Sequence, residues 1–289
     1  MKQLLFSLTG FLVCFGAMAQ ADTTGKPQSA DTIRVGNIII IKKHDGKEKK
    51  DEKTKEEKGD NDDVTVEIKE RKEYKKSNTT TNWFIVDLGF SNVNDQTNYS
   101  SAATQTFMQG VNGGGNSNTL NLRNGKSINV NVWFFMQRVN LIKHVLNLKY
   151  GLGIEMNNYR YENNIRYGYN PARIYSDSIS FSKNKLAADY ITLPVMLNFN
   201  FAPKRKKSYG VSAGISAGYL YAARQKLKSD ARGKEKIKND FNLEPWKIAA
   251  IGELNLGVVR LYGSYALNNL HQNGLEQTPY NFGIRLSSW

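Results

Sequence analysis

Residues 146–157 read Leu-Asn-Leu-Lys-Tyr-Gly-Leu-Gly-Ile-Glu-Met-Asn, and this stretch decides the fold. Every second residue is apolar or aromatic, and the residues between them are polar, charged or glycine. Successive side chains of a β-strand point to opposite faces, so this alternation predicts a strand with one apolar and one polar face. Such a strand suits a transmembrane barrel, in which one face meets lipid and the other meets the lumen.

The same alternation recurs from Trp83 to the end of the chain. Long polar connections follow the first, third, fifth and seventh strands, and short turns follow the second, fourth and sixth. This sorting is typical of outer-membrane barrels. The sequence therefore predicts an all-β fold over residues 82–289: an eight-stranded antiparallel transmembrane β-barrel with short periplasmic turns and long extracellular loops. Met136 is expected on the lipid-facing side of the second strand. The expected strands cover residues 83–91, 128–137, 146–157, 191–201, 211–221, 246–256, 258–268 and 280–287.

Residues 1–19 have the pattern of a secretory signal peptide. Lys2 supplies the positive charge, residues 4–16 form an apolar core, and Ala17-Met18-Ala19 is a small-x-small cleavage site. The core is shorter than the roughly 18 residues of a membrane-spanning helix. Cys14, the single cysteine of the chain, lies inside this core. A lipid-modified cysteine is an alternative, but it would leave almost no apolar core.

Residues 20–81 form a charged, largely disordered extension that we expect in the periplasm. Lys, Glu and Asp dominate residues 42–76, so this stretch has too little apolar surface to offset the entropy of ordering. Two short apolar runs, residues 38–41 and 64–68, are the exception and could pair as a small hairpin. The expected role of the extension is a flexible linker or a docking segment for a periplasmic partner.

The net charge of +14 calls for a counter-charge. An exported chain rarely meets nucleic acid, so we expect no nucleic-acid partner and favour anionic lipid head groups. The third long loop, residues 225–244, is strongly basic. If it faces outward, it lies near the phosphates of lipopolysaccharide and could bind them; a solvated mobile loop is the alternative. Its cations are Lys226, Lys228, Arg232, Lys234, Lys236 and Lys238.

Charges of both signs fall on the face of the strands that we expect to point inward. An eight-stranded barrel is wide enough for side chains to fill it or for one small ligand. These charges therefore favour a plugged, salt-bridged lumen. A narrow ion path and a proton-coupled or ligand-binding role remain open. The expected lumen network consists of Asp87, Lys149, Glu155, Lys247, Glu253, Arg260 and Arg285.

The sequence offers little chemistry for an enzyme. An outer-membrane enzyme would rest on His271 with a loop carboxylate such as Glu276, because the other two histidines fall elsewhere in the pattern. We therefore expect a non-enzymatic protein with no cofactor and no metal site.

The fourth strand carries a motif that points to a family. Tyr190-Ile191-Thr192-Leu193-Pro194-Val195-Met196-Leu197 resembles the Tyr-x-x-x-Pro-apolar-x-apolar strand of the outer-membrane β-barrel family of Bacteroidetes, which includes the PorT-like proteins. Residues 210–221 and 261–265 resemble further strands of that family. The resemblance covers residues 83–289 and implies an eight-stranded barrel of the OmpA/OmpX type in the outer membrane. It implies mixed functions, among them accessories of secretion systems, and no catalytic residues.

Trp289 ends the chain with an aromatic residue, as outer-membrane barrels usually do for the insertion machinery. It is out of phase with the apolar residues Phe282, Ile284 and Leu286, so whether it serves as that signal stays open. The sequence predicts a monomeric envelope scaffold or surface-interaction protein in contact with lipid and lipopolysaccharide. The alternatives are a narrow channel, an accessory of a secretion or transport system, and a soluble barrel with a small ligand.

Overall fold

The computed structural model describes residues 31–35, 38–43, 65–70, 77–203 and 209–286. The chain divides into two compact units, residues 1–76 and residues 77–289. The expected signal peptide and terminal Trp289 lie outside the described residues. In the first unit, β1 (Asp31–Val35), β2 (Ile38–Lys43) and β3 (Thr65–Glu70) form an antiparallel sheet in the order β1-β2-β3. Ile40 pairs with Ile68, so the hairpin expected from the two apolar runs is present.

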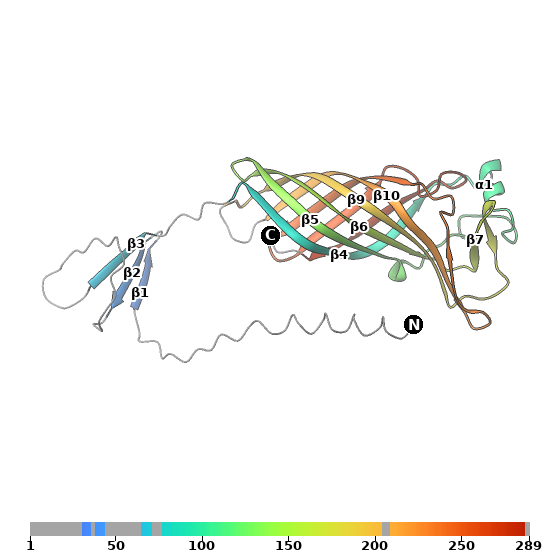
Figure 1. Cartoon of the computed structure of the whole chain (residues 1–289), viewed down its shortest axis with the longest axis horizontal. Helices are drawn as coiled ribbons and strands as arrows, with labels where there is room; N and C mark the ends of the chain where they lie inside the picture. The colour runs from blue at the N-terminus through green and yellow to red at the C-terminus, as the bar shows by residue number, and fades with distance from the viewer. Residues whose placement is uncertain (1–30, 36–37, 44–64, 71–76, 204–208, 287–289) are drawn as a thin grey trace. The chain divides into compact units, whose positions relative to one another are not determined.

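Eight antiparallel strands of the second unit close into a ring (Figure 1). The order is β10-β12-β13-β14-β4-β5-β6-β9, and pairing of β9 with β10 closes the barrel. The fold class and the number of strands agree with the sequence prediction. The bounds are β4 (Thr79–Asp95), β5 (Ile128–Ile142), β6 (Leu146–Arg160), β9 (Lys183–Asn200), β10 (Tyr209–Ser229), β12 (Trp246–Leu256), β13 (Arg260–Ala266) and β14 (Gln277–Leu286).

The predicted position of Met136 is wrong, because a bulge changes the phase of β5. The pairing with β6 shifts between Trp133 and Phe135, so Phe134 is an extra residue in the strand. Residues on the two sides of a bulge change their facing relative to simple alternation. Met136 is therefore fully buried and packs inside the barrel with Trp133 and Met196.

Pro194 lies in the middle of β9, where a proline cannot donate a ladder hydrogen bond. On one side it is in register with Ser216 of β10. On the other side the β6–β9 register passes from Tyr150↔Val195 to Gly153↔Thr192, and Pro194 falls in the gap. The missing donor therefore coincides with an interruption of the ladder.

Short turns join the strands at one end of the barrel, which we call the turn end. Lys143 and His144, between β5 and β6, have positive φ angles of 45° and 57°. Two such residues in succession match the twist of a tight hairpin. Gly257, between β12 and β13, has a φ of +85°, a conformation that glycine adopts without a steric penalty.

The opposite end, which we call the loop end, carries secondary structure that the sequence prediction missed. The first long connection holds α1 (Ala102–Phe107) and the 3₁₀ helix η1 (Asn124–Lys126). The second holds the hairpin of β7 (Ile165–Tyr169) and β8 (Ala172–Ser176). In the third, β10 continues to Ser229 and pairs with β11 (Gly233–Lys238). No helix within the described part of the chain has the length and apolar character to cross a bilayer.

Candidate functional site

A chain of ion pairs crosses the lumen and joins four strands. Arg285 of β14 donates two parallel hydrogen bonds to Asp87 of β4, each 2.7 Å long. Its third nitrogen bonds to Glu253 of β12 at 2.7 Å, and Glu253 also accepts from Lys149 of β6 at 2.6 Å. All four residues are at most 7% exposed. The bidentate geometry of Arg285 fixes both direction and spacing, as a lone ammonium group would not.

A second ion pair lies in the same lumen. Lys247 of β12 donates to Glu155 of β6. The same carboxylate accepts hydrogen bonds from the amides of Asn157 and Asn281, each at 3.0 Å. Arg260 is also buried, and its Nε lies 3.5 Å from Asn255 Oδ1. The structure thus brings the seven inward charges together as four cations and three carboxylates, and a functional role for them stays a prediction.

Little space is left between these side chains. The cavity in the lumen measures about 30 Å³ and is bordered by Trp133, Glu155, Met196, Tyr262 and Arg285, among others. A volume of this size holds roughly one or two water molecules. The buried Trp133 indole borders this cavity and donates to Asp87 at 2.7 Å. A Cβ atom at Gly153 would lie 2.7 Å from this ring, so glycine makes room for it.

The long connections fold into a cap with a hydrophobic core at the loop end. The cap core combines buried side chains of all four connections with residues from the ends of the barrel strands. Thr104 in α1 donates to the Gly274 carbonyl at 2.7 Å, which ties the first connection to the fourth. Leu243 and His271 form an isolated bridge between the third and the fourth. Principal members of the core are Phe107, Leu120, Tyr159, Ile165, Tyr167, Leu186, Tyr190, Phe241, Leu243 and Leu275.

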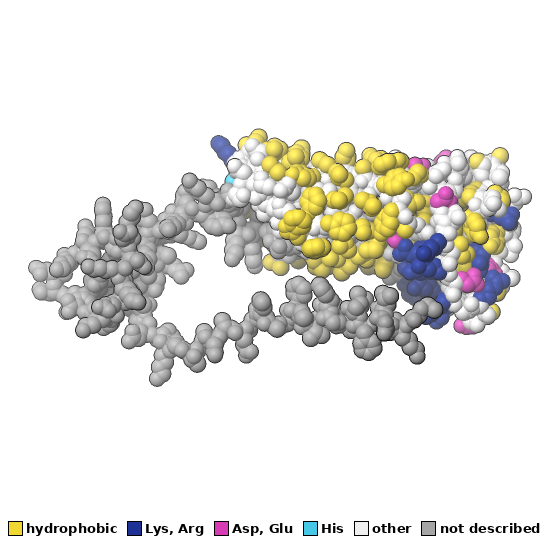
Figure 2. Space-filling model, viewed as in Figure 1, with side chains coloured by type: hydrophobic (Ala, Val, Ile, Leu, Met, Phe, Trp, Pro, Cys, Tyr) yellow, Lys and Arg dark blue, Asp and Glu magenta, His cyan; other side chains and the backbone are white. Residues whose placement is uncertain are grey.

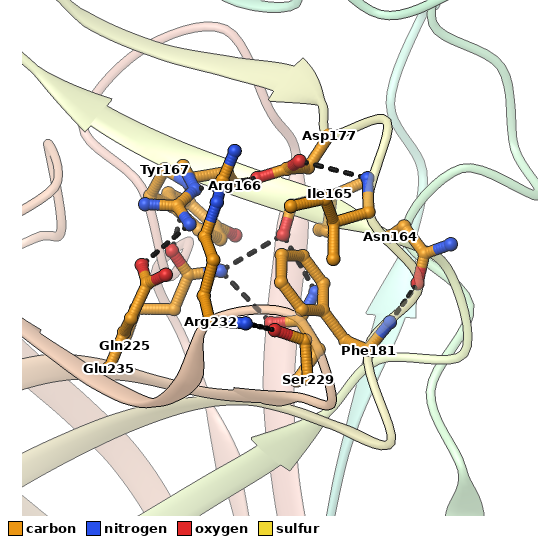
Figure 3. A network of polar contacts seen from close by, with 12 residues as sticks. Asn164, Ile165, Arg166, Tyr167, Asp177, Phe181, Gln225, Ser229, Arg232 and Glu235 are labelled. Carbon is orange, nitrogen blue, oxygen red and sulfur yellow. Dashed lines mark hydrogen bonds and ion pairs between the residues drawn. The ribbon is translucent and has the colours of Figure 1, made fainter.

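Ion pairs and one glutamine hold the β7–β8 hairpin on β10 and β11 (Figure 3). Arg166 bridges Asp177 at 3.0 Å and Glu235 at 2.6 Å. Arg232 makes a second contact with Asp177 at 3.0 Å. Burial alone would raise the pKa of Asp177, but the Ile179 amide and the two arginines lower it below its usual value.

Gln225 of β10 is fully buried, and its side chain hydrogen-bonds to the backbone of the β7–β8 hairpin. Its side-chain oxygen accepts from the Tyr167 amide at 3.0 Å, and its nitrogen donates to the Ile165 carbonyl at 3.1 Å (Figure 3). The same nitrogen donates to Asn184 at 2.9 Å. One side chain of β10 therefore pairs with two backbone groups of β7 and with the side-chain oxygen of Asn184 on β9, as a buried polar group requires.

His271 does not form a catalytic arrangement with Glu276. It is 2% exposed, stacks parallel to Tyr167 with ring centroids 5.9 Å apart, and meets the edge of Phe107. Neither of its ring nitrogens has a hydrogen-bond partner among the described residues. Burial lowers the pKa of His271 to about 3. The imidazole is therefore neutral and acts as a packed aromatic side chain.

The outward face of the ring is apolar. Figure 2 shows hydrophobic side chains, in yellow, over most of the visible barrel wall; with the exposed apolar residues of the other strands they form the belt. Exposed apolar patches on soluble proteins rarely exceed a few hundred Å², whereas a lipid-facing band needs this surface. The belt includes Leu88, Ile128, Ile191, Leu193, Val195, Leu197, Ile215, Leu254, Leu261 and Ile284, each at least 40% exposed.

A model of the outer membrane protein beta-barrel domain family matches residues 86–272, well over half of the chain. The chain belongs to this family. A search among curated proteins finds no match. Membership agrees with the closed ring, the apolar belt and the polar interior, and it makes residues 77–289 an outer-membrane β-barrel domain.

In this outer-membrane barrel the basic segment is a β-hairpin, so its predicted loop conformation is wrong. Lys226 and Lys228 lie on β10, and Lys234, Lys236 and Lys238 lie on β11. Gln225, Leu227 and Ser229 alternate with them and are buried in the cap, so the strand period continues past the membrane belt. Arg232 lies in the turn and belongs to the Asp177 network.

Sequence reasoning missed further cations that the pairing of β6, β9 and β10 brings to this hairpin. Lys183, Lys185 and Arg224 alternate with buried residues, and Arg160 lies opposite Lys185. The signal was present, because residues 183–186 and 224–229 have period-two alternation of charged with buried residues. The sequence prediction missed these strand extensions because their outward positions are charged, whereas it identified the other strands by their apolar outward residues.

Proposed function

We propose that this outer-membrane barrel is a non-enzymatic envelope scaffold or surface-interaction protein. Its lumen is a structural core, and its cap is the part that meets other molecules. The observation that carries this proposal is the paired lumen: Arg285, Asp87, Glu253 and Lys149 span it as one ion-pair chain with about 30 Å³ of cavity beside it. A conducting path would need continuous hydrated space, and the cap core adds a second barrier at the loop end.

The proposal includes an orientation. The export signal over residues 1–19 directs the chain out of the cytoplasm, residues 20–81 lie in the periplasm with the turn end, and the cap faces outward. This matches the usual placement of long loops in outer-membrane barrels. A cysteine in place of exposed Ser117 in the first long connection tests it. A membrane-impermeant thiol reagent should label it on intact cells, and protection until the cells are lysed would reverse the orientation.

Heat-modifiable gel mobility followed by planar-bilayer recording tests the sealed barrel. The full chain should shift in mobility on boiling, as closed membrane barrels do, and should give no steady unitary current. A steady conductance in a preparation with the mobility shift would make the narrow channel the better account.

An accessory role in secretion is the second proposal, and the PorT-like motif around Pro194 favours it. Such a role needs a partner in the periplasm, for which the 20–81 extension is the candidate. Deletion of residues 20–76, which leaves β4 whole, should release a co-purifying protein while the barrel keeps its heat-modifiable shift. Retention of every co-purifying protein would remove the support for this role.

A further inference from the structure

Nine cations from four neighbouring strands share one surface at the loop end, which we call the cationic face. Lys185 of β9 lies between Arg160 of β6 and Lys226 of β10, and Lys226 lies opposite Lys236 of β11. A second row runs Lys183, Lys228, Lys234 in the same way. The members are Arg160, Lys183, Lys185, Arg224, Lys226, Lys228, Lys234, Lys236 and Lys238.

These side chains point away from the cap core. Their neighbours along the strands, Asn184, Leu186, Gln225 and Leu227, are buried in the cap, so strand alternation turns the cations outward. Figure 2 shows a dark blue cluster directly beyond the yellow belt.

The cationic face begins where the lipid-facing belt ends. Tyr221 is exposed on β10, and Tyr219 below it packs against Trp246 with ring centroids 5.0 Å apart. Aromatic residues of this kind mark the level of lipid head groups. Arg224 follows Tyr221 by three residues, a distance of roughly 10 Å along a strand. The first cations therefore lie at or just above the head groups of an adjacent lipid.

The positive charges of the cationic face are not balanced by carboxylates in the part of the chain that the structure describes. Like charges directly opposite each other on paired strands are destabilising. Arg224 has a carboxylate partner in Asp189, and among the described residues it is the one member of the face with such a partner. Lys185 donates to a neutral amide, that of Asn158, at 2.7 Å. The arrangement contrasts with the lumen, where carboxylates separate the cations.

We propose that the cationic face binds the phosphate groups of lipopolysaccharide, with the acyl chains of the same molecule packed on the apolar belt. This inference rests on the outward orientation proposed above. A phosphorylated glycolipid complements both surfaces at once, because its phosphates lie at the border between acyl chains and sugar. Lysines near a membrane surface attract anionic lipid head groups.

The test measures binding of bisphosphorylated and dephosphorylated lipid A micelles to the full chain in a neutral detergent. The triple variant Lys185→Gln/Lys226→Gln/Lys236→Gln removes the three lysines of the row that begins at Arg160. Its matched control is Lys126→Gln/Lys143→Gln/Arg173→Gln, which removes the same charge at exposed positions outside the face. A heat-modifiable gel shift establishes that each variant is folded.

The triple variant should bind bisphosphorylated lipid A about a hundredfold more weakly than the wild type, since each lysine near an anionic surface contributes roughly a factor of five to binding. The control variant and the wild type should bind it equally. Dephosphorylated lipid A should bind weakly to all three proteins, and the three substitutions on the cationic face should not change its affinity.

Equal loss in the control, or equal binding of both lipid A forms, would overturn the proposal, since net charge or acyl chains alone would then explain the affinity. Inorganic pyrophosphate that binds as tightly as lipid A would assign the face to a soluble phosphate and also overturn it. Binding in detergent depends on neither conductance nor the orientation of the chain. A failure here therefore stays distinct from a failure of the sealed-barrel proposal, which bilayer recording detects.

Discussion

The lumen and the cationic face are both rich in charge, and they treat it in opposite ways. In the lumen, Glu253 lies between Lys149 and Arg285 and accepts from both. On the cationic face, Lys226 lies between Lys185 and Lys236 with no carboxylate in that row. Both patterns sit on antiparallel strands of one sheet, and β6 contributes to each, so the difference comes from the side chains and not from the backbone.

This difference separates a structural role from a binding role. Buried ions are costly to desolvate and persist where partners and hydrogen bonds compensate for them. Exposed cations need no partner to stay soluble, but a regular row of them repels itself and attracts a polyanion. The paired charges therefore indicate an interior that needs no ligand to balance its charge. The row of lysines on the cationic face indicates a surface that binds an external anion.

The largest expected effect comes from breaking the paired region. Arg285→Ala leaves Asp87 and Glu253 buried without their shared cation, and loss of one partner of a buried pair costs about 3–5 kcal/mol. The midpoint of urea unfolding in lipid vesicles should fall accordingly. Lys236→Ala is the control, because it removes an equal charge from the exposed face. A loss for Arg285→Ala of less than about 1 kcal/mol would show that the lumen network is not a structural core.

Two neighbouring residues of β10 sharpen the comparison, because they face opposite ways. Gln225→Leu removes the side-chain acceptor of the Tyr167 amide, at about 1–3 kcal/mol, and leaves the Ile165 carbonyl with Asn184 as its remaining side-chain donor. Hydrogen exchange at β7 should accelerate while exchange in the barrel wall stays slow. Lys226→Leu, one residue further, should leave exchange at β7 unchanged. Equal acceleration in both variants would contradict the assigned facing.

His271 gives the stability of the cap a dependence on pH in the acidic range. Its pKa is about 3 in the folded cap and near 6.5 when exposed, so the unfolded state binds more protons between these values. Stability is complete above pH 6.5 and falls by about 1.4 kcal/mol per unit as the pH drops toward 3. His271→Leu should remove this slope from the unfolding of the cap, followed by Trp and Tyr fluorescence. A slope that survives the substitution would assign it to other groups.

The smallest expected effect on stability comes from substitution of a single lysine of the cationic face. Without anionic lipid, Lys226→Gln should raise the unfolding midpoint in low-salt detergent by a few tenths of a kcal/mol, since one like-charge row is relieved. Added salt should abolish the gain through screening. A loss of stability at low salt would show that Lys226 already has a compensating partner in the free protein.

The sequence predicted the barrel well because alternation with period two depends on local residues. The strand around Lys149 and Glu155 and the turn at Gly257 follow directly from it. The alternation rule failed at Phe134, where a bulge changes which side chains face the lumen. The bulge depends on how Trp133 and Gly153 fit together across two strands. No local pattern contains that contact.

The sequence predicted the residues of the lumen network but not the way in which they pair, and it predicted only part of the cationic face. The inward charges were identified from facing alone, but the order in which Arg285 joins Asp87 to Glu253 depends on which strands lie opposite across the lumen. The cationic face needed the register of β9, β10 and β11, which places Lys185 and Lys236 on either side of Lys226. Composition located the charge, and tertiary pairing supplied the row.

Single-channel recording of the purified full chain in planar bilayers tests the central claim, that paired charges make the lumen a closed core. The account predicts a silent bilayer for protein whose insertion is verified by its heat-modifiable shift. Arg285→Ala, where it remains folded, should open a measurable leak because its side chain fills the lumen beside the small cavity. Steady unitary currents from the wild type, altered by Arg285→Ala in size or ion selectivity, would contradict the account and make the lumen a pore.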